Sequence, residues 1–261
     1  MLFSKWSKNI KPNTKFIAQN VNYYKTIDST NNIAKITNCP NGTLFIAETQ
    51  TDGKGRMGRK WASKKNCGIW MSIVLIPDIP AEQVNFLTLT VGLAVCETLN
   101  KLYNLPFKIK WPNDIVINGK KVCGILTEGE ADNDRIKKVV VGIGINVNTK
   151  SFPEELKNIA TSIYMITGKK SNRAKIINTF AEIFESYYKS IINGNTDIIE
   201  KYKDLCITIN KEVVAIKNTE QIKGIATDIT KTGELTIKKE DGTTLNINSG
   251  EVSVRGIYGY I

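Results

Sequence analysis

The sequence contains no histidine among its 261 residues. Histidine is the usual general base of hydrolytic enzymes and the commonest metal ligand, so its absence excludes serine–histidine and cysteine–histidine hydrolysis. The five cysteines are odd in number, and no two have the Cys-x-x-Cys spacing of a zinc site. We therefore expect neither a disulfide framework nor a protein-bound metal. Free thiols suit a reducing, cytoplasmic compartment.

Long apolar runs are also missing. No stretch reaches the roughly 20 residues that cross a bilayer, and the first residues lack the apolar segment of a signal peptide. What is abundant is positive charge: 36 Lys and Arg against 25 Asp and Glu give a net charge of +11 and a pI near 9.3. Such a balance favours anionic ligands or partners, but it does not choose between nucleotides, nucleic acids and acidic proteins.

The spacing of apolar residues predicts an α+β protein of two domains. After about residue 207 glycines recur every eight or nine residues, at positions 224, 233, 242 and 250, as in small β-domains with regular turns. We therefore predict a first domain over 1–206 and an all-β domain over 207–261. Strands of the first domain are predicted at 43–47, 69–76, 107–111, 114–117, 120–126 and 139–147, and helices at 82–103 and 171–192.

An Asn-Gly pair at 118–119 separates two apolar runs and predicts a two-residue β-hairpin. With this turn Asp114 pairs with Cys123, and Asp114 shares a sheet face with Lys121, roughly 7–8 Å away at Cα. Lys110 has the same parity and joins them if the intervening proline does not turn the chain. The alternative is a solvated strand face with alternating charge, which is common in sheets.

Residues 53–61 read Gly-Lys-Gly-Arg-Met-Gly-Arg-Lys-Trp. Glycine lets the backbone approach a ligand closely, and arginine and lysine donate charge-assisted hydrogen bonds to carboxylates and phosphates. The loop lacks the spacing of a P-loop, and its bare Gly-x-Gly-x-x-Gly string is a weak signal. Three interpretations stay open: an anion-binding loop, which we favour, a nucleic-acid loop in which Trp61 stacks on a base, or a solvated basic loop.

Two further polar segments have both a structural and a functional interpretation. Residues 28–31, Asp-Ser-Thr-Asn, form a helix cap in most proteins, but they could also bind a ligand. Gly142 and Gly144 interrupt an apolar strand, which indicates close packing or a nearby ligand. Asn146 either forms a turn at the strand end or contacts the ligand.

Together and in order, these motifs resemble those of the biotin protein ligases. They span most of residues 25–150, and a late segment, 249–255, resembles the C-terminal segment of that family. The matching motifs are Asp28-Ser-Thr-Asn31, Glu48-Thr-Gln50, the loop 53–61, Lys110-Trp-Pro-Asn-Asp114, Lys121-Val-Cys-Gly-Ile-Leu126 with Glu128, and Gly142-Ile-Gly-Ile-Asn146.

The resemblance implies an ATP-dependent ligase. Such an enzyme activates biotin to biotinyl-5′-AMP, with Mg²⁺ accompanying ATP, and transfers biotin to a lysine of biotin carboxyl carrier protein in acetyl-CoA carboxylase or a related carboxylase. The implied fold is a catalytic domain with a mixed β-sheet and flanking helices, as in class II synthetases and biotin–lipoate ligases, followed by an SH3-like β-barrel. A homodimer is implied only by resemblance. Because 27 residues precede Asp28, we expect no winged helix-turn-helix and no sequence-specific DNA binding.

The resemblance also assigns roles to individual residues. Two positions depart from the family pattern: Lys54 replaces an arginine and so loses bidentate geometry, and Met57 stands where a basic residue is frequent. The expected catalytic residues are Arg56, Lys110, Asp114 and Lys121. The expected biotin-binding residues are Ser29, Thr30, Asn31, Gln50, Lys54, Gly55, Arg56, Lys121 and Gly124. The expected ATP-binding residues are Arg56, Arg59, Trp61, Lys110 and Asn146.

Three other functions compete with this interpretation. A lipoate or octanoate ligase of the same fold would need a long apolar acyl pocket and a different loop. A basic nucleic-acid-binding protein fits the charge, but aromatic residues do not interleave with the basic ones outside the loop 53–61. A non-catalytic biotin-binding module would not need Lys110, Asp114 and Lys121.

Overall fold

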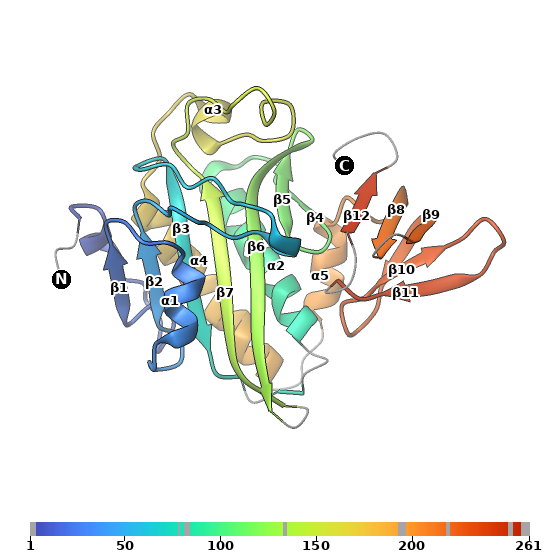
Figure 1. Ribbon diagram of the computed structural model, residues 1–261, viewed down its shortest axis with the longest axis horizontal. Coiled ribbons are helices and arrows are strands. Elements are labelled where there is room, and N and C mark those ends of the chain that lie inside the picture. The colour runs from blue at the N-terminus through green and yellow to red at the C-terminus, as the bar shows by residue number, and fades with distance from the viewer. Residues whose placement is uncertain are drawn as a thin grey trace.

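The computed structural model describes residues 4–77, 79–80, 84–132, 135–192, 197–217, 220–249 and 253–256. Figure 1 shows a large mixed sheet with helices on both faces and a smaller sheet beside one edge of it. The predicted fold class is therefore confirmed. None of the helices in these ranges is long and apolar enough to cross a membrane.

The large sheet has seven strands in the order β1-β2-β3-β7-β6-β5-β4. β1 and β2 are parallel, and every other neighbouring pair is antiparallel. The strands are β1 (Val21–Tyr24), β2 (Leu44–Ala47), β3 (Gly68–Leu75), β4 (Lys108–Lys110), β5 (Asp114–Ile117), β6 (Lys120–Asp132) and β7 (Arg135–Asn146). The helices are α1 (Thr30–Ile36), α2 (Val84–Tyr103), α3 (Ile163–Thr167), α4 (Arg173–Ile192) and α5 (Ile198–Leu205), with 3₁₀ turns η1 (Ser7–Asn9) and η2 (Arg56–Gly58).

Successive residues of the central strands alternate between two buried faces of the sheet, as the period of a strand requires. Phe45 of β2 and Val74 of β3 pack with Ala34 of α1 in a small cluster. Their neighbours Leu44 and Ile73 belong to the main core, which contains α2 and α4. In Figure 1, α1 lies in front of the sheet and α2 and α4 lie behind it. The sheet is thus covered on both faces, and α1 is placed over the central strands.

The prediction of one apolar stripe on α2 captures only part of its surroundings. Besides the predicted Leu87, Val91, Val95 and Leu99, residues on other sides such as Leu93 are fully buried. α2 packs against the sheet, α4 and α5 together, so it is enclosed on most sides. Its described part is Val84–Tyr103, and the predicted start at residue 82 lies outside the described residues.

The last five strands form an antiparallel sheet in the order β11-β10-β9-β8-β12, consistent with the predicted SH3-like unit. Gly233 and Gly242 lie in turns with positive φ, as predicted. The turn predicted at Gly224 is wrong, because this glycine lies inside β9, where a Cβ would come within 2.4 Å of the Lys238 carbonyl oxygen. The glycine at position 250 lies outside the described residues. The strands are β8 (Lys211–Lys217), β9 (Glu220–Ile229), β10 (Leu235–Lys238), β11 (Thr244–Ile247) and β12 (Ser253–Gly256).

The two sheets share one continuous apolar core, to which Ile229 and Leu235 contribute from the small sheet. The turn at Gly233 also accepts a hydrogen bond from the Trp111 indole (3.2 Å), and Lys203 of α5 pairs with Asp228 of β9 (2.7 Å). A domain boundary at residue 207 stays a prediction, but the two units pack as one hydrophobic body.

The N-terminal segment, which gave no signal in the sequence, is held by a carboxylate on α4. The backbone amides of Lys15, Phe16 and Ile17 all donate to Glu185, at 2.9–3.1 Å. Although burial raises the pKa of Glu185, hydrogen bonds from Lys189 and these amides lower it to about 2. Glu185 is only 4% exposed, so the segment is fastened to the core by an ionised group.

We expect Glu185→Gln to lower the free energy of unfolding by about 2–3 kcal/mol at neutral pH. Because the folded-state pKa lies below the unfolded value, this stabilisation is fully present above about pH 4.5. It is lost as the pH falls towards 2, so the wild-type and variant curves converge there. Urea denaturation across pH 2–7 measures the difference, and Glu182→Gln is the control, because Glu182 accepts only one exposed amide among the contacts described. A constant difference at all pH values would contradict the prediction.

Candidate functional site

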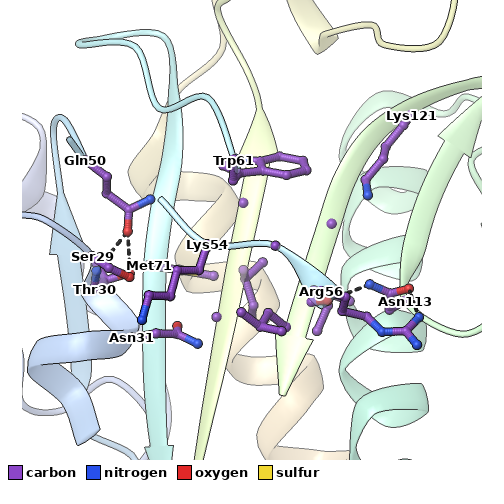
Figure 2. A pocket seen from close by; sticks show the side chains of 17 residues that line it. Ser29, Thr30, Asn31, Gln50, Lys54, Arg56, Trp61, Met71, Asn113 and Lys121 are labelled. Carbon is purple, nitrogen blue, oxygen red and sulfur yellow. Dashed lines mark hydrogen bonds between the residues drawn. The ribbon is translucent and has the colours of Figure 1, made fainter. Parts of the chain in front are cut away.

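Two adjoining cavities lie where α1, the loop 53–61 and the strands β5, β6 and β7 meet. Figure 2 shows the first of them. The first measures about 50 Å³ and the second about 260 Å³. They share a wall, because five residues line both: Gly55, Arg56, Trp61, Asn113 and Lys121. A cavity of about 50 Å³ is smaller than typical ligand pockets of roughly 300 Å³ or more, so side chains of the loop must move for a ligand to enter.

Every residue predicted to bind biotin lines the first cavity. Most residues predicted to be catalytic or to bind ATP line the second cavity. They are Arg56, Arg59, Trp61, Asp114, Lys121 and Asn146. Lys110 lines neither cavity. It lies at the end of β4, paired with Asp114 and 7% exposed, so the structure does not bring this predicted catalytic residue to the cavity wall.

The closed end of the first cavity is a network of hydrogen bonds at the start of α1 (Figure 2). The side-chain oxygen of Gln50 accepts hydrogen bonds from the backbone N–H (2.8 Å) and the hydroxyl (3.0 Å) of Thr30. Its amide nitrogen donates to Ser63 (2.7 Å), just beyond the loop. A helix does start at residues 28–31, since α1 begins at Thr30 with Ser29 at the N-cap, but Ser29 makes no side-chain capping bond.

Glycines make room for two of the predicted site residues. A Cβ on Gly142 would lie 2.3 Å from Oδ1 of Asn31, and one on Gly144 would lie 2.5 Å from the indole of Trp61. On the neighbouring strand β6, the missing side chain of Gly124 also makes room for the Trp61 ring, since a Cβ there would lie 2.8 Å from it. The predicted close packing of the Gly-x-Gly strand is therefore confirmed. No acceptor among the described residues pairs with the buried indole N–H of Trp61.

The glycine-rich loop 53–61 folds back on itself like a tight hairpin. Gly55 N–H donates to the Arg59 carbonyl, and Trp61 N–H donates to the Gly53 carbonyl, both at 2.7 Å. Its tip bears Met57, which has a left-handed φ of 54° and is exposed. The loop thereby holds Trp61 at its base and presents cations along its length.

The predicted pairing of Asp114 with Lys121 on one sheet face is confirmed by an ion pair of 2.5 Å. The predicted register is wrong by one residue: Asp114 pairs with Gly124 rather than Cys123, because a β-bulge shifts the register between β5 and β6. The Lys121 ammonium also lies 5.1 Å from the centre of the Trp61 ring, within cation–π range. It therefore stands at the junction of the two cavities.

Arg56 connects the loop to two distant segments. Its guanidinium donates to Oδ1 of Asn113 (3.0 Å) and to the carbonyl of Ser249 in the small sheet's unit. Asn113 in turn donates to the Ile125 carbonyl (2.7 Å). Burial lowers the pKa of Arg56 and the charge of Asp114 opposes this, but an arginine stays protonated at neutral pH. A second fixed cation thus lies beside Lys121.

The apolar wall of the second cavity was not predicted from the sequence. This wall comes from the segment after β7, which has no periodic pattern. The segment pairs with the start of β6, since Lys121 N–H donates to the Ile159 carbonyl (2.8 Å) and Thr161 N–H donates to the Lys121 carbonyl (2.9 Å). Its lining residues are Phe152, Leu156, Ile159 and Ala160.

The described residues contain no group of three or more His, Cys, Asp and Glu side chains that could hold a metal. Asp114 is the carboxylate that lines the second cavity, and it is paired with Lys121. The site therefore suits a metal that arrives bound to phosphate oxygens and retains its waters, as Mg²⁺ commonly does.

The catalytic part of the chain matches the biotin/lipoate A/B protein ligase family over residues 23–146, and residues 208–255 match the biotin protein ligase C-terminal domain. The bifunctional ligase/repressor BirA of Bacillus spizizenii is 40% identical over 88% of this chain and 72% of its own length. The biotin–[acetyl-CoA-carboxylase] ligase of Mycobacterium tuberculosis is 31% identical over 81% of this chain and 78% of its own. Among solved structures, the biotin protein ligase of Aquifex aeolicus in complex with biotin and ATP is 34% identical, with a TM-score of 0.81 over 91% of this chain and 99% of that one.

Proposed function

We propose, from the premise that this chain belongs to the biotin protein ligase family, that it activates biotin with ATP to biotinyl-5′-AMP. It then transfers biotin to a lysine of the biotin carboxyl carrier protein of acetyl-CoA carboxylase. The observation that carries the proposal is the pair of adjoining cavities with Lys121 and Arg56 in their shared wall. The polar closed end suits the head group of biotin, and the apolar wall with Asn146 suits adenine.

The first step joins two anions, because the biotin carboxylate attacks the α-phosphorus of ATP and expels pyrophosphate. Negative charge gathers where the two cavities meet. Fixed cations there stabilise the transition state more than the bound substrates, and this difference lowers the barrier. Arg56 and Lys121 lie at this point. The biotin carboxylate is already ionised at neutral pH, so the step needs no histidine.

The second step transfers the acyl group from biotinyl-5′-AMP to the carrier lysine and releases AMP. The intermediate is a mixed anhydride that water would hydrolyse, so a loop that closes over it preserves it. We assign this role to residues 53–61, with Lys54 over biotin and Arg59 on phosphate. Asp114 would orient the incoming lysine, since it lies on the same sheet face as Lys121.

Lys110 lies in a different place from the one that the resemblance implies. By resemblance it contacts the reacting carboxylate and phosphate, but here it is buried beside Asp114 and away from the cavity walls. We propose that it supports the position of Asp114.

ATP–pyrophosphate exchange tests the proposed function. Exchange is expected with biotin and not with lipoate or octanoate, because the closed end of the cavity is built from polar groups such as Thr30 and Gln50. Exchange with lipoate or octanoate alone would assign a different acid to the same fold. The ligase proposal fails if none of the three acids supports exchange.

Cytoplasmic location and a homodimer are further parts of the proposal. All five cysteines are free, as expected in a reducing compartment. β1 lies at the edge of the large sheet, where a second copy could extend it. Sedimentation velocity with and without biotin and ATP measures the oligomeric state.

A further inference from the structure

We infer that Glu128 is a positioning residue that selects the biotin head group by fixing the orientation of the Asn31 amide. Glu128 lies on β6 and lines neither of the two cavities. The inference rests on the proposed function and names one determinant of its substrate specificity. It is drawn from the hydrogen bonds around α1, β3 and β6.

The two groups that flank the Asn31 side chain define which way its amide points. Nδ2 of Asn31 donates to Oε2 of Glu128 (2.7 Å), and Oδ1 of Asn31 meets the hydroxyl of Ser72 (2.6 Å). A carboxylate can only accept hydrogen bonds, so Glu128 requires the NH₂ group on its own side. Oδ1 is consequently directed at Ser72, beside the Cα of Gly142.

Glu128 is ionised in this position. Burial raises its pKa, but hydrogen bonds from Lys35 and Asn31 and the charges of Lys35 and Lys54 outweigh burial and lower it. The Lys35 ammonium lies 2.5 Å from the other carboxylate oxygen, Oε1. One oxygen of Glu128 therefore accepts a hydrogen bond from Asn31, and the other pairs with the half-exposed Lys35.

With Asn31 held in this way, the closed end of the cavity has one acceptor too many. Three oxygen–oxygen contacts join Asn31, Ser72, Thr30 and Gln50 in a chain. Two hydroxyl groups supply only two protons to these three contacts. The hydroxyl of Thr30 donates to Gln50, so the single proton of Ser72 serves either Thr30 or Asn31.

An excess acceptor in a buried pocket favours a ligand that brings an N–H donor, because leaving the acceptor unpaired is costly. The ureido ring of biotin carries N–H groups, whereas lipoate and octanoate carry none at the corresponding end. If Glu128 were an amide, Asn31 could turn over and donate to Ser72, whose proton would then serve Thr30. The network would be satisfied without the ligand, and the preference for N–H donors would fall.

The experiment compares Glu128→Gln with wild type by calorimetric titration of biotin in the absence of ATP, and by exchange kinetics. We expect Glu128→Gln to raise the Kd for biotin about tenfold and to raise the KM for biotin by a similar factor. The kcat and the KM for ATP should stay within about twofold of wild type. Discrimination between biotin and an analogue methylated on a ureido nitrogen is expected to shrink by a similar factor. A merely structural role would not produce this split.

Two controls separate the amide orientation from other effects. Lys35→Met removes the other partner of the same carboxylate and is expected to leave the biotin Kd within about twofold. In an Asn31→Ala background, Glu128→Gln is expected to change the Kd by less than about twofold, because there is no amide left to orient. If Glu128→Gln binds biotin like wild type, or if its effect persists without Asn31, the inference is wrong. Wild-type protein that fails to bind biotin would instead overturn the proposed function.

Discussion

Replacing Lys121 with methionine is expected to reduce biotin-dependent ATP–pyrophosphate exchange at least about a hundredfold, the usual effect of removing one electrostatic stabiliser of a transition state. Lys121 lines both parts of the cavity and holds its ammonium 2.5 Å from Asp114. Without it, the carboxylate of Asp114 would repel the negative charge that develops as the two substrates react. Loss of the cation and exposure of the anion therefore act in the same direction.

Methionine preserves the length and most of the apolar contact of lysine, so the fold should tolerate this change. The matched control is Lys120→Met, the neighbouring residue on the opposite sheet face, whose ammonium bonds only the Lys157 carbonyl among the contacts described (2.9 Å). We expect its exchange rate to stay within about twofold of wild type. Thermal melting of both variants checks that each is folded. A Lys121→Met enzyme that retains a tenth of the wild-type rate would remove this residue from the chemistry.

The relation between Lys121 and Asp114 also shows how far sequence reasoning reaches. An Asn-Gly turn fixes the start of the pairing and the sheet face, because side chains alternate with a period of two. It cannot reveal a bulge farther along the strands, since a bulge depends on how β5 and β6 fit the rest of the sheet. The shared face was consequently predictable, while the partner of Asp114 was not.

At other places in the site, the residue types predicted a contact but not the residue that makes it. Gly142 and Gly144 indicated a close approach, but only the fold identifies Asn31 and Trp61 as the groups that come near. At residues 28–31 the start of a helix was predictable, but its tertiary hydrogen bonds with Gln50 were not. The apolar wall around Phe152 has no periodicity at all, because its residues lie in a loop that is ordered by pairing with β6.

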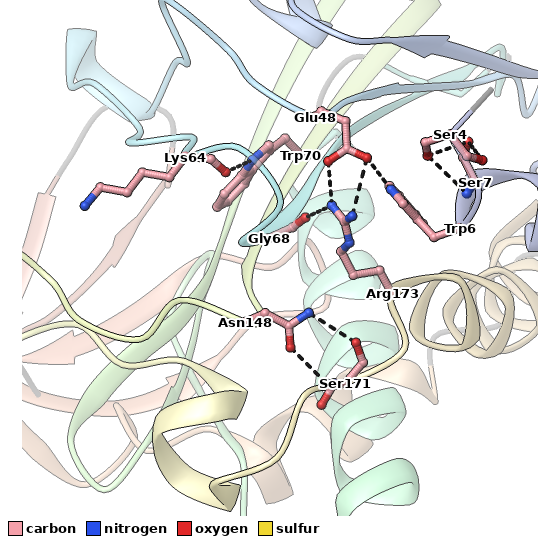
Figure 3. A network of polar contacts seen from close by, with 10 residues as sticks. All are labelled: Ser4, Trp6, Ser7, Glu48, Lys64, Gly68, Trp70, Asn148, Ser171 and Arg173. Carbon is pink, nitrogen blue, oxygen red and sulfur yellow. Dashed lines mark hydrogen bonds and ion pairs between the residues drawn. The ribbon is translucent and has the colours of Figure 1, made fainter. Parts of the chain in front are cut away.

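Replacing Arg173 with methionine is expected to lower the free energy of unfolding by about 3–5 kcal/mol, because it leaves a buried carboxylate unpaired. Figure 3 shows the network: Arg173, at the start of α4, donates to Glu48 (3.0 Å) and to the Gly68 carbonyl (3.1 Å). The indole of Trp6 donates to the same carboxylate and stacks on the guanidinium. Although burial raises the pKa of Glu48, the hydrogen bonds from Arg173 and Trp6 lower it.

Guanidinium denaturation of Arg173→Met measures the loss, with Lys175→Met on the exposed side of the same helix as the control. The double variant Glu48→Gln/Arg173→Met separates the two origins of the effect. If the unpaired charge is the main cost, neutralising Glu48 should recover a substantial part of the lost stability, since an uncharged amide is far cheaper to bury than a lone carboxylate. If the double variant is no more stable than the single one, packing of the arginine rather than its charge holds this junction together.

The same pair of variants bears on the site, because Glu48 lies two residues before Gln50 and directly follows β2. Without its hydrogen bonds from Arg173, Glu48 would no longer hold the segment that places Gln50 against Thr30. Arg173→Met is therefore also expected to raise the KM for biotin more than the KM for ATP. The double variant should restore this selectivity in proportion to the stability it regains. A stability loss without any change in the biotin KM would show that the network supports the N-terminal segment and α4 but not the cavity.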